Sequence, residues 1–111
     1  NRLQYLRYVD RVKDLVIRGG MNIAPAELES LILSHPAVTE CAIVGYPDDV
    51  LGERVCAFAV ATGPLTLDDL VGHLRDRKIA SYKLPERLEV VEALPRNPVG
   101  KILKRDLRGR L

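Results

Sequence analysis

Residues 38–61 read VTECAIVGYPDDVLGERVCAFAVA, and this segment gives the clearest indication of the architecture. It contains two apolar runs, at 38–46 and 53–61, which a turn-rich polar link at 47–52 separates. A link of this length allows the two runs to pair as a β-hairpin. Because both runs are almost continuously apolar, we expect the sheet that contains them to be covered on both faces.

Helices are expected on both sides of this hairpin along the chain. The first begins near Pro25, which suits a first helical turn, and apolar residues repeat at helical spacing until Pro36 ends the pattern. The second covers about 66–78, with Thr66 as the N-cap and Asp69 three residues later. Each helix therefore has an apolar face that can pack against the sheet.

Shorter elements complete the predicted fold. Residues 87–93 alternate in a way that predicts a third sheet strand, and a final helix is expected on the basic stretch that contains Leu103 and Leu107. Residues 5–9 and 15–18 are short β-type runs that could pair as a ribbon or lie as one bent segment. The expected fold class is α+β: a small, mainly antiparallel sheet with helices on both faces, plus an N-terminal two-stranded ribbon.

The composition predicts one cytoplasmic globular domain. The chain has 111 residues, of which 47% are hydrophobic and 29% charged. No apolar run approaches the roughly 20 residues that span a bilayer, and the first ten residues lack the apolar stretch of a signal peptide. Cys41 and Cys56 have neither the spacing of a metal site nor that of a disulfide framework, so we expect a reduced compartment and no metal.

Basic side chains are concentrated at the C-terminal end. Residues 95–111 contain six basic side chains and one acidic one, whereas the first 94 residues carry 11 basic and 14 acidic side chains. A basic tail is compatible either with nucleic acid or with another anionic ligand. Because one Phe and four Tyr offer few rings for base stacking, we expect no nucleic-acid partner.

Four motifs occur in a fixed order along the chain. They are DRVKD at 10–14, GGMNI and PAELE within 19–29, YKLP at 82–85 and PRNPVGKI at 95–102. In this order and spacing they resemble the C-terminal domain of the adenylate-forming enzymes, which include acyl- and aryl-CoA synthetases, luciferases and peptide-synthetase adenylation domains. The resemblance covers about 5–111, and the wording of the first two motifs is most similar to that of a carboxylic acid:CoA ligase.

The resemblance implies that residues 1–111 are the mobile C-terminal lid of an AMP-forming acyl- or aryl-CoA synthetase, with a hinge near 10–14. In such enzymes ATP and a carboxylic acid first give acyl-AMP, and the lid then rotates so that CoA forms the thioester. The partners implied are the protein's own N-terminal domain, the acid, ATP and CoA, with Mg²⁺ on the N-terminal domain. Because that domain carries the phosphate loop and the acid pocket, the lid alone is expected to be inactive.

The resemblance also assigns roles to individual residues. Lys101, in the PxxxxGK motif, is expected to be catalytic, because its charge reaches the carboxylate and the α-phosphate during adenylation. Lys13 is the expected hinge, and Arg11 is expected near the ATP ribose or phosphates. Gly19 and Gly20 are expected to flank the pantetheine channel in the thioester-forming state.

Contacts with the CoA nucleotide are implied for a third segment. Tyr82 matches a position where some relatives stack an aromatic ring on the CoA adenine, and Lys83 could meet a CoA phosphate. Leu84 and Glu86, however, replace basic residues that other relatives use for the nucleotide. The resemblance further implies that a lysine acetyltransferase could act on Lys101, since acetylation removes the charge.

Structural alternatives stand beside these roles. Lys101 and Lys13 could be solvated surface lysines, Arg11 could pair with a neighbouring aspartate, and the Gly19-Gly20 pair could merely close a turn. For the chain as a whole, the alternatives are an adenylating enzyme that loads a carrier-protein phosphopantetheine, and a non-enzymatic basic binding module.

Overall fold

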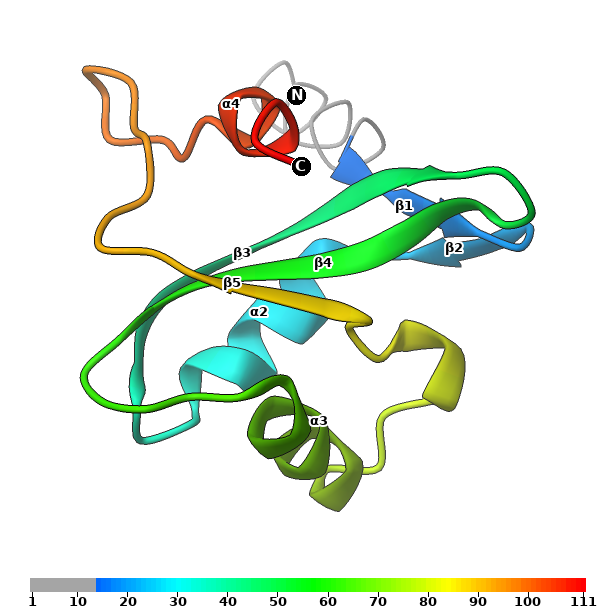
Figure 1. The fold of residues 1–111 in the computed structure, drawn as a ribbon, viewed down its shortest axis with the longest axis horizontal. Coiled ribbons are helices and arrows are strands. Elements are labelled where there is room, and N and C mark those ends of the chain that lie inside the picture. Colours follow the sequence, from blue (N-terminus) through cyan, green and yellow to red (C-terminus); the bar gives the residue numbers. More distant parts are fainter. Residues whose placement is uncertain (1–13) are drawn as a thin grey trace, which may run out of the picture.

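The computed structural model describes residues 14–111, which form a five-stranded sheet with helices on both of its faces (Figure 1). The strands are β1 (Val16–Arg18), β2 (Met21–Ile23), β3 (Val38–Asp48), β4 (Gly52–Ala61) and β5 (Arg87–Val90). The helices are α2 (Pro25–Leu33), α3 (Leu67–Asp76), α4 (Lys104–Arg108) and the short 3-10 helix η1 (Ser81–Lys83). In this part of the chain no helix is long and apolar enough to cross a membrane.

The hairpin of β3 and β4 is the centre of the sheet. The two strands pair antiparallel down to Asp48, which lies opposite Gly52. The Asp48 carboxylate accepts hydrogen bonds from the N–H groups of Val50 (3.1 Å) and Leu51 (2.7 Å), which closes the turn. The predicted hairpin is therefore confirmed, although β3 continues through Pro47, which is tolerated because β3 lies at the edge of the sheet.

The other edge of β4 pairs with two strands. β1 meets it antiparallel at Gly52, whereas β5 pairs with it in parallel from Cys56, opposite Arg87, to Ala59, opposite Val90. A parallel pair needs a long crossover, and the segment that contains α3 supplies it. The sheet is thus mainly antiparallel, as predicted, with β5 as the exception.

Apolar side chains cover both faces of the hairpin. On one face, α2 and α3 pack against alternate strand residues such as Ile43 and Ala57. On the other face, Leu107 of α4 packs with Val44 and Phe58. Figure 1 shows α2 and α3 on one side of the sheet and α4 on the other, which confirms the expectation from the continuous apolar runs.

The ends of α3 follow from local hydrogen bonds. The Thr66 hydroxyl accepts from the Asp69 N–H (3.1 Å), and the Asp69 carboxylate accepts from the Thr66 N–H (3.2 Å), which is the capping box expected from the sequence. The helix ends at Asp76, two residues earlier than predicted, because Lys78 adopts the left-handed conformation with φ of 60°.

A short hairpin of β1 and β2 contains the Gly19-Gly20 pair, and the sequence analysis did not predict β2. Met21 lies in β2, and it pairs opposite Arg18 of β1. Gly19 (φ 58°) and Gly20 (φ 80°) form the turn, and a hairpin turn with two consecutive positive φ angles favours glycine. The three residues of β2, Met21, Asn22 and Ile23, are too few for their alternation to indicate a strand. The predicted ribbon partner at 5–9 lies outside the described residues.

Candidate functional site

The loop that carries Lys101 is closed at its base and ordered by one side chain. Arg96 and Ile102 form an antiparallel bridge, and the Asn97 N–H donates to the Lys101 carbonyl (2.9 Å). The Asn97 side-chain oxygen accepts from the N–H groups of Val99 (3.0 Å) and Lys101 (2.9 Å). The Lys101 peptide is therefore held at both its N–H and its carbonyl by Asn97.

Gly100 and Arg96 complete this loop. Gly100 has φ of 93°, in the left-handed region that favours glycine, and its carbonyl accepts from the Arg96 guanidinium (2.7 Å). Arg96 also forms an ion pair with Glu40 of β3. Through Arg96, the Gly100 carbonyl is therefore linked to Glu40 of the sheet. This contact gives the loop at 95–101 a defined conformation.

Lys101 is exposed and lines an open groove of about 700 Å³ beside α4. Among residues 14–111, the groove is lined by the acidic side chains of Asp14 and Glu29 and by five basic ones: Arg96, Lys101, Lys104, Arg105 and Arg108. A groove with an excess of positive charge can stabilise carboxylate or phosphate oxygens.

Lys104 is held by carboxylates from two other segments. Its Nζ lies 2.6 Å from Asp14 Oδ2 and 2.9 Å from Glu29 Oε2, and the Lys104 side chain is 17% exposed. The same oxygen of Glu29 accepts from the Ile43 N–H of β3 (2.9 Å). Lys104 therefore ties α4 to α2 and to Asp14, and its charge is already compensated.

Two of the predicted site residues, Arg11 and Lys13, lie outside the described residues. Their proposed roles in nucleotide binding and as the hinge stay predictions. Asp14, the last residue of the predicted hinge segment, is described and lies against Lys104.

The Gly19-Gly20 turn contacts the turn between β3 and β4. The Gly19 N–H donates to the Leu51 carbonyl (2.8 Å), and a Cβ on Gly19 would lie 3.4 Å from the Leu51 side chain. Apart from Gly20 and its chain neighbours, no described residue has an atom within 4 Å of the position that a Cβ on Gly20 would take. The described residues therefore leave the space next to Gly20 open.

Tyr82 and Lys83 lie on η1, an element that the sequence pattern did not predict. Lys83 Nζ lies 3.0 Å from Glu27 Oε2 of α2 and 5.9 Å from the centre of the Tyr82 ring. The hydrogen bond from Lys83 to Glu27 raises the pKa of Lys83. Tyr82 is half-buried and packs against the core, so only part of its ring surface faces solvent.

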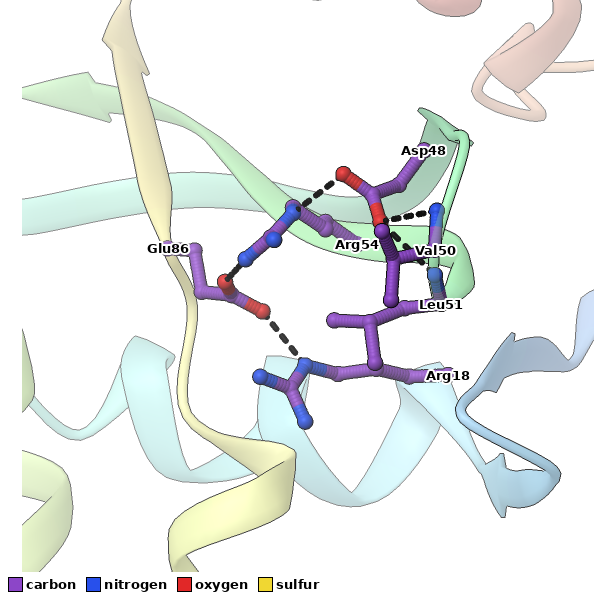
Figure 2. A network of polar contacts seen from close by, with 6 residues as sticks. All are labelled: Arg18, Asp48, Val50, Leu51, Arg54 and Glu86. Carbon is purple, nitrogen blue, oxygen red and sulfur yellow. Dashed lines mark hydrogen bonds and ion pairs between the residues drawn. The ribbon is translucent and has the colours of Figure 1, made fainter.

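Four charged residues form a continuous chain of ion pairs between β1, the β3–β4 turn and the start of β5 (Figure 2). One oxygen of Glu86 accepts from Arg18 Nε (2.5 Å), and the other accepts from Arg54. Arg54 Nε also donates to Asp48 (2.7 Å).

The charge states of these ion-paired residues follow from their contacts. Partial burial opposes the charge on Glu86, but the hydrogen bonds from Arg18 and Arg54 outweigh it and lower the pKa of Glu86. The hydrogen bond from Arg54 likewise lowers the pKa of Asp48. The hydrogen bonds to Asp48 and Glu86 in turn raise the pKa of Arg54. Glu86, Asp48 and Arg54 are therefore charged at neutral pH.

In the sequence, Glu86 and Leu84 are distinguished only as replacements for basic residues that other relatives use. In the structure Leu84 is buried in the core with α2 and α3, whereas Glu86 bridges two arginines. Glu86 and Arg18 are separated by 68 positions in the sequence, and no local pattern indicates such a contact.

The predicted site residues form two groups. Arg18, the residue before Gly19, forms an ion pair with Glu86, three residues after Lys83. This ion pair connects the Gly19-Gly20 turn with the segment of Tyr82 and Lys83, the two segments with predicted CoA contacts. The loop of Lys101 lies at the opposite end of the sheet from the β1–β2 hairpin (Figure 1).

Comparisons with known proteins identify a family and several similar enzymes. A family model described as the AMP-binding enzyme C-terminal domain matches residues 27–101. The chain is 47% identical over 104 residues to pseudomonine synthase PmsE of Pseudomonas entomophila (strain L48), covering 93% of this chain and 17% of that protein. It is 44% identical over 104 residues to 2-succinylbenzoate–CoA ligase of Bacillus cereus (strain Q1), covering 94% of this chain and 21% of that protein.

A solved structure agrees with these matches. The fatty acyl CoA synthetase of Mycobacterium tuberculosis superimposes with a TM-score of 0.84 at 44% identity, covering 90% of this chain and 20% of that chain. The chain thus spans about a fifth of the length of the relatives it matches.

Proposed function

The chain belongs to the family of AMP-binding enzyme C-terminal domains, and we propose that it is the lid of an ATP-dependent carboxylic acid:CoA ligase. One observation carries the proposal. Lys101 is presented on an ordered loop beside a basic groove, and the Gly19-Gly20 turn lies at the other end of the sheet. A single domain can therefore offer different surfaces to two successive reactions.

The first surface serves adenylation. An oxygen of the carboxylic acid attacks the α-phosphorus of ATP, acyl-AMP forms and pyrophosphate leaves. The ammonium group of Lys101 offsets the negative charge on the reacting oxygens, and a charge placed in this way is typically worth ~10² to 10³ in rate. Arg11 is proposed to contact the ATP ribose or phosphates.

The second surface serves thioester formation. After the lid rotates about Lys13, the CoA thiol attacks the acyl carbonyl of acyl-AMP, and AMP leaves. Gly19 and Gly20 flank the path of the pantetheine arm in this proposal. The open space next to Gly20 and the absence of side chains at the turn support that role.

Mg²⁺ is placed on the N-terminal domain, together with ATP. The described residues hold no cluster of three His, Cys, Asp or Glu side chains that suits a metal ion, so no step in this domain is assigned to a metal. We place the full enzyme in the cytoplasm, where ATP and CoA are available and where the free cysteines Cys41 and Cys56 stay reduced.

An enzyme that loads a carrier-protein phosphopantetheine is the second candidate. Lys83 is already paired with Glu27, and Tyr82 is partly covered by the core. Contacts with the CoA nucleotide would therefore require local rearrangement, whereas a pantetheine arm on a carrier protein does not need them. Family membership favours either enzyme over a freestanding basic binding module.

Lys101 is also proposed as the target of a lysine acetyltransferase. Its side chain is exposed on a surface loop, and acetylation would remove the charge that adenylation requires.

The test is to join this chain to its native N-terminal portion and to screen carboxylic acids for ATP-dependent AMP release with and without CoA. Lys101→Ala should lower acyl-AMP formation by ~10² to 10³ while leaving thioester formation from supplied acyl-AMP nearly unchanged. Arg110→Ala is the matched control, because it removes an exposed basic side chain of the same tail that does not line the groove. Equal losses in both half-reactions for Lys101→Ala would contradict the role of Lys101.

The acceptor is tested in the same system. Turnover with free CoA supports the CoA ligase, whereas acyl transfer only to a phosphopantetheinylated carrier protein supports the second candidate. The 111-residue chain alone should release no AMP from any acid, and measurable AMP release would contradict its assignment as a lid.

A further inference from the structure

A closed circuit of polar contacts passes through Gly19, and Figure 2 shows the part of it that runs from Leu51 through Asp48, Arg54 and Glu86 to Arg18. The Gly19 N–H donates to the Leu51 carbonyl, and the Leu51 N–H donates to Asp48. From Asp48 the circuit continues through the ion pairs of Arg54, Glu86 and Arg18, and Arg18 is bonded covalently to Gly19. The circuit therefore returns to the residue from which it began.

Glu86 is the member that closes this circuit. Each of its two carboxylate oxygens accepts from a different arginine, one on β1 and one on β4. The Glu86 N–H also donates to the Val55 carbonyl of β4 (2.9 Å), so the sheet fixes the backbone from which the carboxylate extends. The backbone of Glu86 is therefore fixed on β4, and its carboxylate can in turn fix the positions of the Arg18 and Arg54 guanidinium groups.

The charges explain what the loss of Glu86 would do. The side chains of Arg18 and Glu86 are each 25% exposed, and that of Arg54 is 35% exposed, so solvent screens them only in part. Without the Glu86 charge, Arg54 would keep its ion pair with Asp48, whereas Arg18 would lose its ion pair with Glu86 and, among residues 14–111, has none with Asp48 to replace it. The backbone pairing of Arg18 with Gly52 and the Gly19–Leu51 hydrogen bond would still connect the turn to the β3–β4 hairpin, but its side-chain connection to the start of β5 would be lost.

We propose that Glu86 is a positioning residue for thioester formation, because it holds the Gly19-Gly20 turn and the η1 segment with Tyr82 and Lys83 as one rigid unit. The inference rests on the proposed function, in which both segments face the thiol substrate. Glu86 acts through Arg18 and makes no contact with the reacting atoms. Adenylation depends on Lys101 at the other end of the sheet, so Glu86 affects the two half-reactions unequally.

The test uses Glu86→Gln in the full-length enzyme. Gln keeps the size of the side chain but removes its charge. Acid-dependent ATP–pyrophosphate exchange should stay within about twofold of the parent, whereas single-turnover conversion of acyl-AMP and CoA to thioester should slow about tenfold. Glu89→Gln is the matched control, because Glu89 pairs with Arg87 on β5 outside the circuit, at 2.8 Å, and loses the same charge.

A double-mutant cycle tests the route through Arg18. Arg18→Gln combined with Glu86→Gln should slow thioester formation no more than Glu86→Gln alone, since both changes break the same contact. If the two effects add, Glu86 does not act through Arg18.

A thermal melt of each variant separates positioning from folding. Equal loss of both half-reactions together with a lower melting temperature would show that Glu86 is only structural, and an unchanged thioester rate would also overturn the proposal. If Glu86→Gln does not fold, Glu86→Asp serves instead, because it keeps the charge but is too short to reach both arginines. A parent enzyme that forms no thioester overturns the proposed function, whereas an active parent with an equally active Glu86 variant overturns only this inference.

Discussion

Lys104 Nζ lies 2.6 Å from Asp14 Oδ2, although 90 positions separate the two residues. Glu29 shares the same ammonium group at 2.9 Å. α4 has only five residues, too few to be stable as an isolated helix. The contacts of Lys104 and the burial of Leu107, worth about 2 kcal/mol, therefore hold α4 in place. The end of the predicted hinge segment is thus attached to the helix beside Lys101.

Replacing Lys104 should weaken this attachment. Lys104→Met keeps the apolar stem but leaves the carboxylates of Asp14 and Glu29 without their shared cation, which should lower the free energy of unfolding by about 2 kcal/mol. Urea unfolding of the 111-residue chain measures the effect. Arg110→Met, an exposed change in the same tail, should have almost none; equal effects of the two changes would show that the ion pairs contribute nothing.

Asn97 should influence adenylation without touching the substrate. Asn97→Ala removes the oxygen that accepts from the N–H groups of Val99 and Lys101, so the loop loses its order and acyl-AMP formation should fall about tenfold in the full enzyme. Asn97→Asp keeps an acceptor oxygen and should restore most of the rate. Thioester formation from supplied acyl-AMP should be unchanged in both variants, and a loss there would place Asn97 outside the Lys101 loop's function.

Two substitutions at Gly20 can separate the effect of side-chain size on activity from the effect of backbone strain. Gly20→Ala and Gly20→Leu both place an L-residue at φ of 80°, at a cost of about 1 to 2 kcal/mol, and neither Cβ meets an atom within 4 Å. The two variants should therefore melt at similar temperatures. Only Gly20→Leu should accumulate bound acyl-AMP in the presence of CoA. If both variants form thioester at the parent's rate, Gly20 does not flank the thiol's path.

Glu86 should make the stability depend on pH in the acid range. Its pKa in the folded chain lies below the ordinary value of 4.5, so its contribution is present above pH 4.5 and is lost as the pH falls through the lower folded-state pKa. The parent should be more stable than Glu86→Gln by about 1 kcal/mol at pH 7, and the difference should shrink below pH 4.5. Urea unfolding of both chains across this range measures it; a constant difference would show that ionisation of Glu86 is not involved.

The two cysteines should be unreactive while the chain is folded. Burial raises the pKa of Cys41 and of Cys56 to about 12, so at pH 8 roughly one thiol in ten thousand is ionised. A thiol reagent should modify the native chain slowly and the urea-unfolded chain rapidly at both positions. Fast modification before unfolding would show that one of these thiols is accessible.

The sequence predicted the long elements and several short ones, and it missed β2 and η1 among the described elements. The helices that begin at Pro25 and near Thr66, and the β3–β4 hairpin, have enough residues for periodicity and capping signals to appear. β2 and η1 have three residues each, and tertiary contacts define them. Two prolines and a glycine at 95–100 disfavour regular structure, and this segment forms an irregular loop before Lys101.

Contacts between distant segments could not be predicted. A carboxylate such as Glu86 has the same local signature whether it is solvated or bridges two arginines, and its partners depend on how the strands pair. The parallel pairing of β5 with β4 could not be predicted either, because four residues with a strand pattern do not indicate in which direction the strand runs relative to its neighbour.

The parallel pairing of β5 also sets the order in which the domain folds. β3 and β4 are joined by a short turn, so their hairpin closes with little loss of chain entropy, whereas β5 must wait until the whole crossover through α3 has collapsed. Glu86 immediately precedes β5, so we expect its ion pairs with Arg18 and Arg54 to form after that crossover is complete. During refolding, the amide protons of the β3–β4 hairpin should become protected from exchange before those that β5 covers, and the arginine contacts of Glu86 mark the end of the process.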